Sequence, residues 1–125
     1  FVAHMSGDTI AEINTAYETT ELPEKRERHH GDNTECAFRG WNEVWLVNDF
    51  RQWNIEEYLP SIGVPLQVIQ GVNDEYGTAA QVDAIAAMAG GTVETVMLDD
   101  CGHSPHRDQP DAVLRAMTAF IDQLL

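Results

Sequence analysis

The second half of the chain has one pattern that strongly restricts its fold, a strand–helix–strand–helix order with short connections. Residues 64–69 form a short apolar run rich in β-branched residues and bounded by glycines, which predicts a buried strand. Residues 78–89 repeat apolar side chains at helical spacing and end at two glycines. Residues 93–98 predict a second strand and residues 110–125 a last helix. Because short connections in this order favour parallel pairing, we expect an α/β fold.

The last helix should have Pro110 in its first turn. Its apolar face comprises Val113, Met117, Phe120, Ile121 and Leu124. Two parallel strands are too few for a comfortable sheet, because parallel strands need neighbours and cover on both faces. We therefore expect further strands to lie outside this chain. A first residue Phe1 rather than Met is also what a fragment or processed chain would have.

The sequence pattern of the first part of the chain, residues 1–59, predicts helices, and no segment of it has the pattern of a good strand. Three apolar residues share one helical face: Ile10, Ile13 and Tyr17. Asp8 is placed to cap the start of that helix. We expect two parts, a helical segment at residues 1–59 and a strand-containing segment at residues 60–125.

Two loops that follow the predicted strands carry the candidate catalytic residues. Ligands of open α/β sheets bind beyond the carboxyl ends of the strands. The first loop contains Asp74 and the second contains His103, so both side chains should reach the same edge of the sheet. An Asp that accepts the Nδ1 proton of a His fixes the tautomer and stabilises the imidazolium formed during acyl transfer. We expect these two groups to lie within hydrogen-bond reach.

The two loops resemble the end of an α/β-hydrolase, in which the acid follows one late strand and the histidine follows the next. The matching stretches are residues 70–74 (QGVND) and 101–106 (CGHSPH). Acid before histidine also agrees with the order of the family's triad, serine, acid, histidine. The resemblance implies that residues 60–125 are the C-terminal part of the core and that Asp74 is the triad acid and His103 the general base. More loosely, the first part resembles the helical lid of such enzymes.

The nucleophile that this resemblance requires is missing from the sequence. A nucleophile elbow has the pattern G-x-S-x-G, and none of the three serines fits it: Ser6, Ser61 and Ser104. The oxyanion-hole loop is absent as well. If the resemblance holds, the serine and most of the sheet belong to upstream sequence. The implied activity is ester-type hydrolysis of a small molecule without a cofactor or metal, although the reaction type depends on analogy because the fold serves several reactions.

Three sets of residues have alternative interpretations. Glu75 is an alternative acid one residue along the loop. A metal site is the alternative for four residues: Asp99, Asp100, His103 and His106. The tryptophans Trp41, Trp45 and Trp53 are predicted to line a substrate pocket, and packing between lid and core explains each of them equally well.

Composition excludes some partners and leaves a second class of function open. The formal net charge of −14 would repel polyanions, so we expect neither nucleic acid nor an anionic membrane as partner. The two cysteines, Cys36 and Cys101, have no metal-site or disulfide-framework spacing, which favours a reducing cytoplasm. No apolar run approaches the roughly 18 residues that a bilayer requires. The alternative function is a non-catalytic binding or interaction module, and the oligomeric state is not predicted.

Overall fold

The structure is a computed structural model that describes residues 6–125. The chain divides into two compact units between Asn54 and Ile55, close to the boundary expected at residues 59 and 60. A short 3-10 helix, η3 (Glu56–Ser61), belongs to the second unit.

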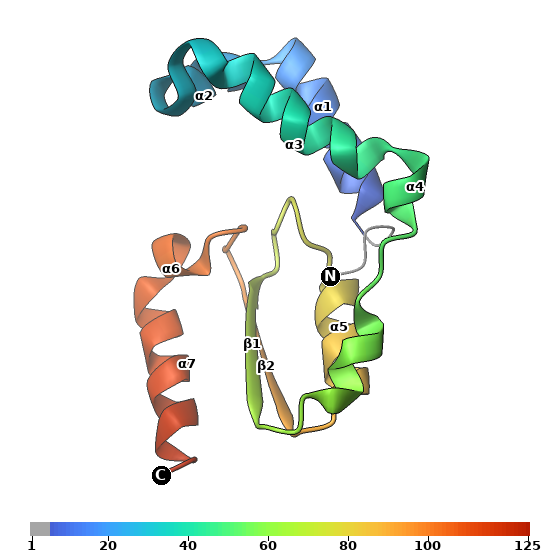
Figure 1. The fold of residues 1–125 in the computed structure, drawn as a ribbon. Helices are drawn as coiled ribbons and strands as arrows, with labels where there is room; N and C mark the ends of the chain where they lie inside the picture. The colour runs from blue at the N-terminus through green and yellow to red at the C-terminus, as the bar shows by residue number, and fades with distance from the viewer. Residues whose placement is uncertain (1–5) are drawn as a thin grey trace. The chain divides into compact units, whose positions relative to one another are not determined.

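The first unit is built from helices (Figure 1). They are α1 (Gly7–Thr19), α2 (Leu22–His30), the 3-10 helix η2 (Gly31–Asn33), α3 (Thr34–Leu46) and α4 (Asn48–Arg51). Both α1 and α2 pack against α3. The helical character expected for this part of the chain is confirmed over the described residues.

Two aromatic rings and one amide form the centre of the helical unit. Ile10, Ile13 and Tyr17 are buried, as their spacing predicted. Phe38 of α3 is fully buried and stacks on Tyr17, with ring centroids 3.7 Å apart. Asn42, one turn further along α3, is also fully buried, and its side-chain amide donates to the Ile10 carbonyl at 3.1 Å. This hydrogen bond offsets part of the cost of burying the amide.

The start of α1 differs from the prediction. Its N-cap is Ser6, because the Ser6 carbonyl accepts the first helical hydrogen bond, from the Ile10 N–H at 3.1 Å. Asp8 lies inside the first turn rather than at the cap. A carboxylate in that turn still interacts favourably with the helix dipole.

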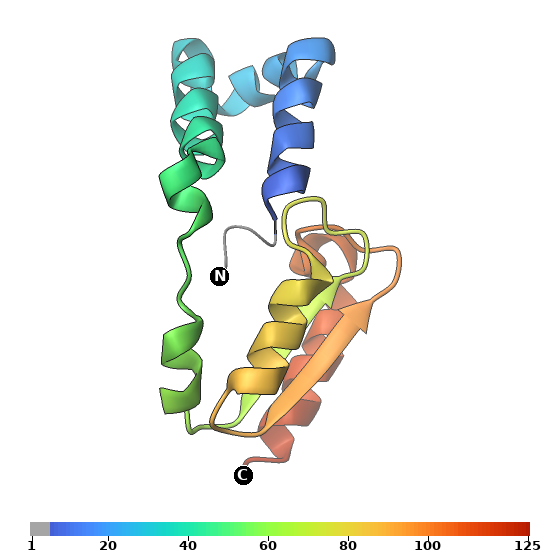
Figure 2. The same cartoon turned by 90° about the vertical axis from the view of Figure 1, so that its right-hand side faces the viewer.

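The second unit contains the predicted strand–helix order. Its elements are β1 (Leu66–Gly71), α5 (Ala79–Met88), β2 (Val93–Leu98), α6 (Pro105–Asp108) and α7 (Pro110–Asp122). The strands pair in parallel, from Leu66 opposite Val93 to Gly71 opposite Leu98. Helices α5 and α7 lie on opposite faces of this two-stranded sheet (Figures 1 and 2). The predicted α/β class, with parallel strands and helices in alternation, is confirmed.

The first strand begins two residues later than predicted, at Leu66 rather than residue 64. Pairing with the segment of β2 starts at this residue, where the Leu66 N–H donates to the Thr92 carbonyl at 2.9 Å. Next along the strand, the Gln67 amide donates to Glu94 Oε1 at 2.8 Å and to the Ala116 carbonyl of α7 at 2.9 Å. This polar contact ties both strands to the last helix.

The sheet and α7 are less buried than the sequence predicted. Residues Leu66–Gln70 of β1 are half-buried rather than buried, and Thr95 and Met97 of β2 are exposed. Met117 and Ile121 of α7 are 46% and 50% exposed, and Leu124, just beyond the end of this helix, is 52% exposed. A sheet of two strands has too little area to cover a helix on each face, and this explains why the strands and α7 are less buried than predicted. Among the described residues, no helix combines the length and apolar character needed to cross a bilayer.

Candidate active site

The side chains of Asp74 and His103 meet at the carboxyl ends of the two strands. His103 Nδ1 lies 2.9 Å from Asp74 Oδ1 and 3.1 Å from Oδ2, so the expected hydrogen-bond contact is confirmed. Because an ionised carboxylate only accepts hydrogen bonds, the contact assigns the ring proton to Nδ1. The carboxylate side chain is 8% exposed and the imidazole side chain 56% exposed. The pair therefore has a buried acid and an accessible base.

Backbone contacts between the two loops bring this pair together. The Val72 N–H donates to the Leu98 carbonyl and the Asn73 N–H to the Cys101 carbonyl, both at 2.9 Å. At Gly71 the first loop passes so close to the second that a Cβ atom would overlap the carbonyl oxygens of Cys101 and Gly102. Only glycine permits this approach without a backbone shift.

The Asp74 carboxylate is held by the loop that carries it. Its Oδ1 accepts hydrogen bonds from the N–H groups of Tyr76, at 2.8 Å, and Gly77, at 2.9 Å. The same loop is tied to β1, since the Gln70 amide donates to the Gly77 carbonyl at 2.5 Å. A carboxylate that bonds its own backbone two and three residues on is typical of an Asx turn. Its orientation is set before any ligand is present.

The His103 ring has an aromatic neighbour that the sequence did not indicate. The Tyr76 ring is tilted by 57° against the imidazole, with centroids 4.7 Å apart. Since Nδ1 bonds Asp74, Nε2 is the nitrogen that can exchange a proton with a reacting group. The sequence signal that could have pointed to Tyr76 is its position two residues after the acid, inside the turn.

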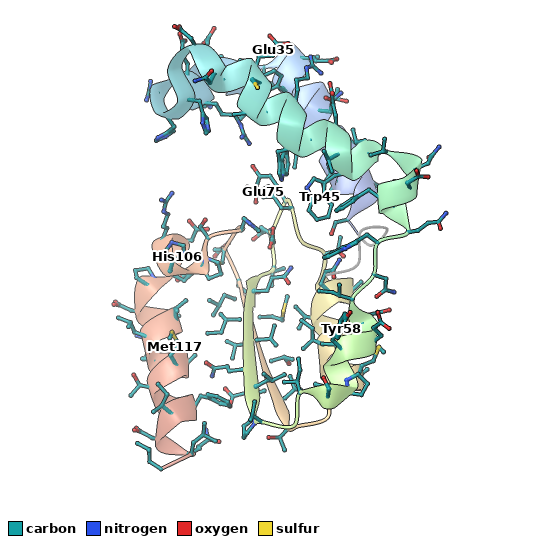
Figure 3. The ribbon with its side chains drawn as sticks, in the orientation of Figure 1. Glu35, Trp45, Tyr58, Glu75, His106 and Met117 are labelled. Carbon is teal, nitrogen blue, oxygen red and sulfur yellow. The ribbon has the colours of Figure 1, made fainter. Side chains whose placement is uncertain are left out.

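Among the described residues, the structure favours neither the alternative acid nor the alternative metal site. Asp74, and not Glu75, bonds the imidazole. Figure 3 shows Glu75 on the loop that follows β1 and His106 on α6. Over residues 6–125, no three His, Cys, Asp or Glu side chains are arranged to hold a metal ion.

Cys101 lies in the loop that follows β2 and packs in the interior of its unit, since it is only 1% exposed. Both cysteines are free thiols. Burial raises the pKa of the Cys101 thiol above its ordinary value of 9.0, and the nearby carboxylates of Asp108 and Asp74 raise it further. The thiol is therefore held in its neutral form.

The raised Cys101 pKa predicts a loss of stability in alkali. The folded chain keeps the thiol proton longer than the unfolded chain, so this contribution is complete below pH 9 and is lost as pH rises through the folded-state value. We expect the urea midpoint of C36S, which retains Cys101, to fall more steeply above pH 9 than that of C36S/C101A. Circular dichroism at each pH measures both midpoints. Parallel curves for the two variants would contradict the assignment.

The three tryptophans lie in the helical unit in two groups. Trp45 is edge-on to Phe50 and Trp53, with centroids 4.8 and 6.4 Å apart, and Phe50 stacks on Trp53 at 5.6 Å. Trp41 is tilted against Phe38 at 6.0 Å. These contacts give each ring a packing role within its unit. That the rings line a substrate pocket stays a prediction.

Comparison with known proteins provides a fold relationship. No protein-family model and no curated protein matches the chain. A solved structure, "Crystal structure of VinJ", is similar, with 20% identity and a TM-score of 0.58 over 94% of this chain and 48% of the VinJ chain. The chain thus spans about half the length of VinJ. At this identity the likeness shows a shared fold alone.

Proposed function

We propose that this chain is the C-terminal part of an α/β-hydrolase that cleaves a small carboxylic ester or a similar derivative. One observation carries the proposal: a buried carboxylate bonds the Nδ1 atom of an accessible imidazole, each placed by the loop after one of two adjacent parallel strands. That is the acid–base half of a serine triad. The nucleophile would come from upstream sequence, because no serine of this chain lies in a G-x-S-x-G pattern.

Each member of the pair has a defined part in this reaction. His103 Nε2 accepts the proton of the serine hydroxyl as the serine attacks the ester carbonyl, and then returns it to the departing alcohol. Asp74 stabilises the imidazolium that exists between these two transfers. The N–H groups of Tyr76 and Gly77 keep the carboxylate turned toward Nδ1. Nothing in this sequence of steps requires a cofactor.

The helical unit would serve as the lid of the same enzyme. Aromatic side chains bind the apolar part of an acyl or alcohol group with little loss of conformational freedom. In this role Trp41, Trp45 and Trp53 would affect which ester is accepted more than the rate of the chemical steps.

A serine-directed probe tests the proposal directly. A fluorophosphonate reacts with an activated serine, so we expect the longer protein that contains this chain to be labelled on a serine outside these 125 residues, within a G-x-S-x-G sequence. The H103A variant should lose the label because its serine has no base. Mass spectrometry of the labelled peptide identifies the site.

Two controls complete this experiment. S61A should be labelled like the wild-type protein, since Ser61 lies in η3 before the sheet. Absence of G-x-S-x-G and of labelling from the longer protein would refute the hydrolase and favour a non-catalytic module.

A further inference from the structure

The loop that carries His103 has an unfavourable backbone conformation that must be held in place. Asp100 has a φ of 50°, in the left-handed region, which Asp adopts more readily than most non-glycine residues but still at some cost in energy. The chain reverses here between β2 and α6. Such a conformation persists when surrounding contacts determine it, so the contacts of this loop decide where the imidazole lies.

Two side chains at the end of α6 reach back to this loop. Asp108 Oδ2 accepts a hydrogen bond from the Gly102 N–H at 2.9 Å. The neighbouring Gln109 amide donates to the carbonyls of Asp99 and Asp100 at 3.3 and 3.4 Å. The first contact is the shorter, and its acceptor is charged, which strengthens a hydrogen bond.

The helix α6 is itself fixed to the loop. The N–H groups of Arg107 and Asp108 both donate to the Ser104 carbonyl, at 2.8 and 3.1 Å. This turn brings Asp108 to the N–H of Gly102, the residue before His103. Asp108 thus contacts Gly102 and Asp74 contacts His103, so two adjacent residues of the loop each have a carboxylate partner.

We propose that Asp108 is a positioning residue for His103: by accepting the Gly102 N–H it holds the loop so that Nδ1 of the imidazole faces Asp74. Gln109 supports the same loop by donating hydrogen bonds to two of its backbone carbonyl groups. The meaning of this contact for catalysis rests on the proposed function. The claim that Asp108 sets the orientation of the ring does not rest on that function, because it concerns only how His103 lies against Asp74.

Nitrogen NMR of histidine measures this positioning without any enzyme assay. In the 125-residue chain labelled with ¹⁵N-histidine, the ring nitrogen shifts give the ratio of the Nδ1–H to the Nε2–H tautomer. We expect the wild-type chain to favour Nδ1–H at His103. D108A should lower this ratio about fivefold, which is the size of effect expected when one hydrogen bond is weakened.

A conservative variant separates the hydrogen bond from the charge and from stability. D108N keeps an oxygen that can accept the Gly102 N–H, so its ratio should stay within about twofold of the wild type. Folded and unfolded chains give separate His103 signals when they exchange slowly, so lower stability reduces the folded signal without moving it. D111A is the matched control, because Asp111 is an exposed acid in the first turn of α7.

The outcomes decide between positioning and a general effect. A wild-type ratio in D108A, a ratio as low in D108N as in D108A, or an equal change in D111A would each overturn the proposal. If the tautomer ratio depends on Asp108 but the longer protein has no reactive serine, the positioning role stands and the hydrolase proposal fails.

Discussion

Replacing His103 with alanine, in a protein that also contains the upstream serine, is expected to lower kcat for a p-nitrophenyl ester by about 10⁴-fold to 10⁶-fold. Without the imidazole, no group removes the serine proton or protonates the leaving alcohol. D74N should cost about 10⁴-fold, because an amide favours the wrong tautomer of the ring. Steady-state kinetics should show the loss in kcat with KM little changed, since neither residue is expected to bind the ground-state ester strongly.

Two comparisons show whether these losses belong to the pair. His106 is an exposed histidine three residues further on, in α6, so H106A should retain nearly full activity. The 125-residue chain tested alone should hydrolyse the ester no faster than an exposed imidazole does. A robust rate from the chain alone that disappears in H103A would place a nucleophile within these residues and would refute a site divided between two stretches of sequence.

Replacing Gly71 with alanine is expected to lower the free energy of unfolding by about 1–3 kcal/mol, the usual cost of inserting a methyl group where there is no space. The added Cβ would overlap the backbone oxygens of Cys101 and Gly102, which are not flexible side-chain ends. The two loops must therefore move apart, and the hydrogen bond from Asn73 to Cys101 must lengthen. The urea midpoint should fall, and the His103 tautomer ratio should fall with it.

A second glycine provides the control for G71A. Gly40 lies in α3, where no described heavy atom would lie within 4 Å of an added Cβ. G40A should stabilise the chain by about 0.5–1 kcal/mol, because alanine favours a helix more than glycine does. If G71A matched the wild type in urea midpoint and tautomer ratio, the close approach of the loops would have no energetic role.

The parts of the fold that depend on local pattern could be predicted from the sequence. The strand at Val93–Leu98 has the expected bounds, and Asp74 and His103 meet because both follow parallel strands. The extent of burial could not be predicted, because it depends on how many strands flank β1. Local periodicity carries no information about that number.

Contacts that depend on the approach of two loops were also missed. Gly71 looked like a strand end, and only the second loop shows why a side chain is excluded there. Likewise, Asp108 lay in a segment expected to be a loop, where α6 forms and directs it toward Gly102. A single acid in a loop has many uses, so its partner is known only once the backbone path is known.

The acid, the base and the groups that orient them all lie between Gln70 and Gln109. The side-chain contacts that orient each of them join residues no more than 10 apart, so they close with little loss of chain entropy, whereas the contact between Asp74 and His103 joins residues 29 apart. Because the stretch is continuous in sequence, a single recombination event could move it whole. Recombination that joins it to a different upstream half would carry over the complete Asp74–His103 contact, and under the proposed function the new half would have to supply only the attacking group and the pocket.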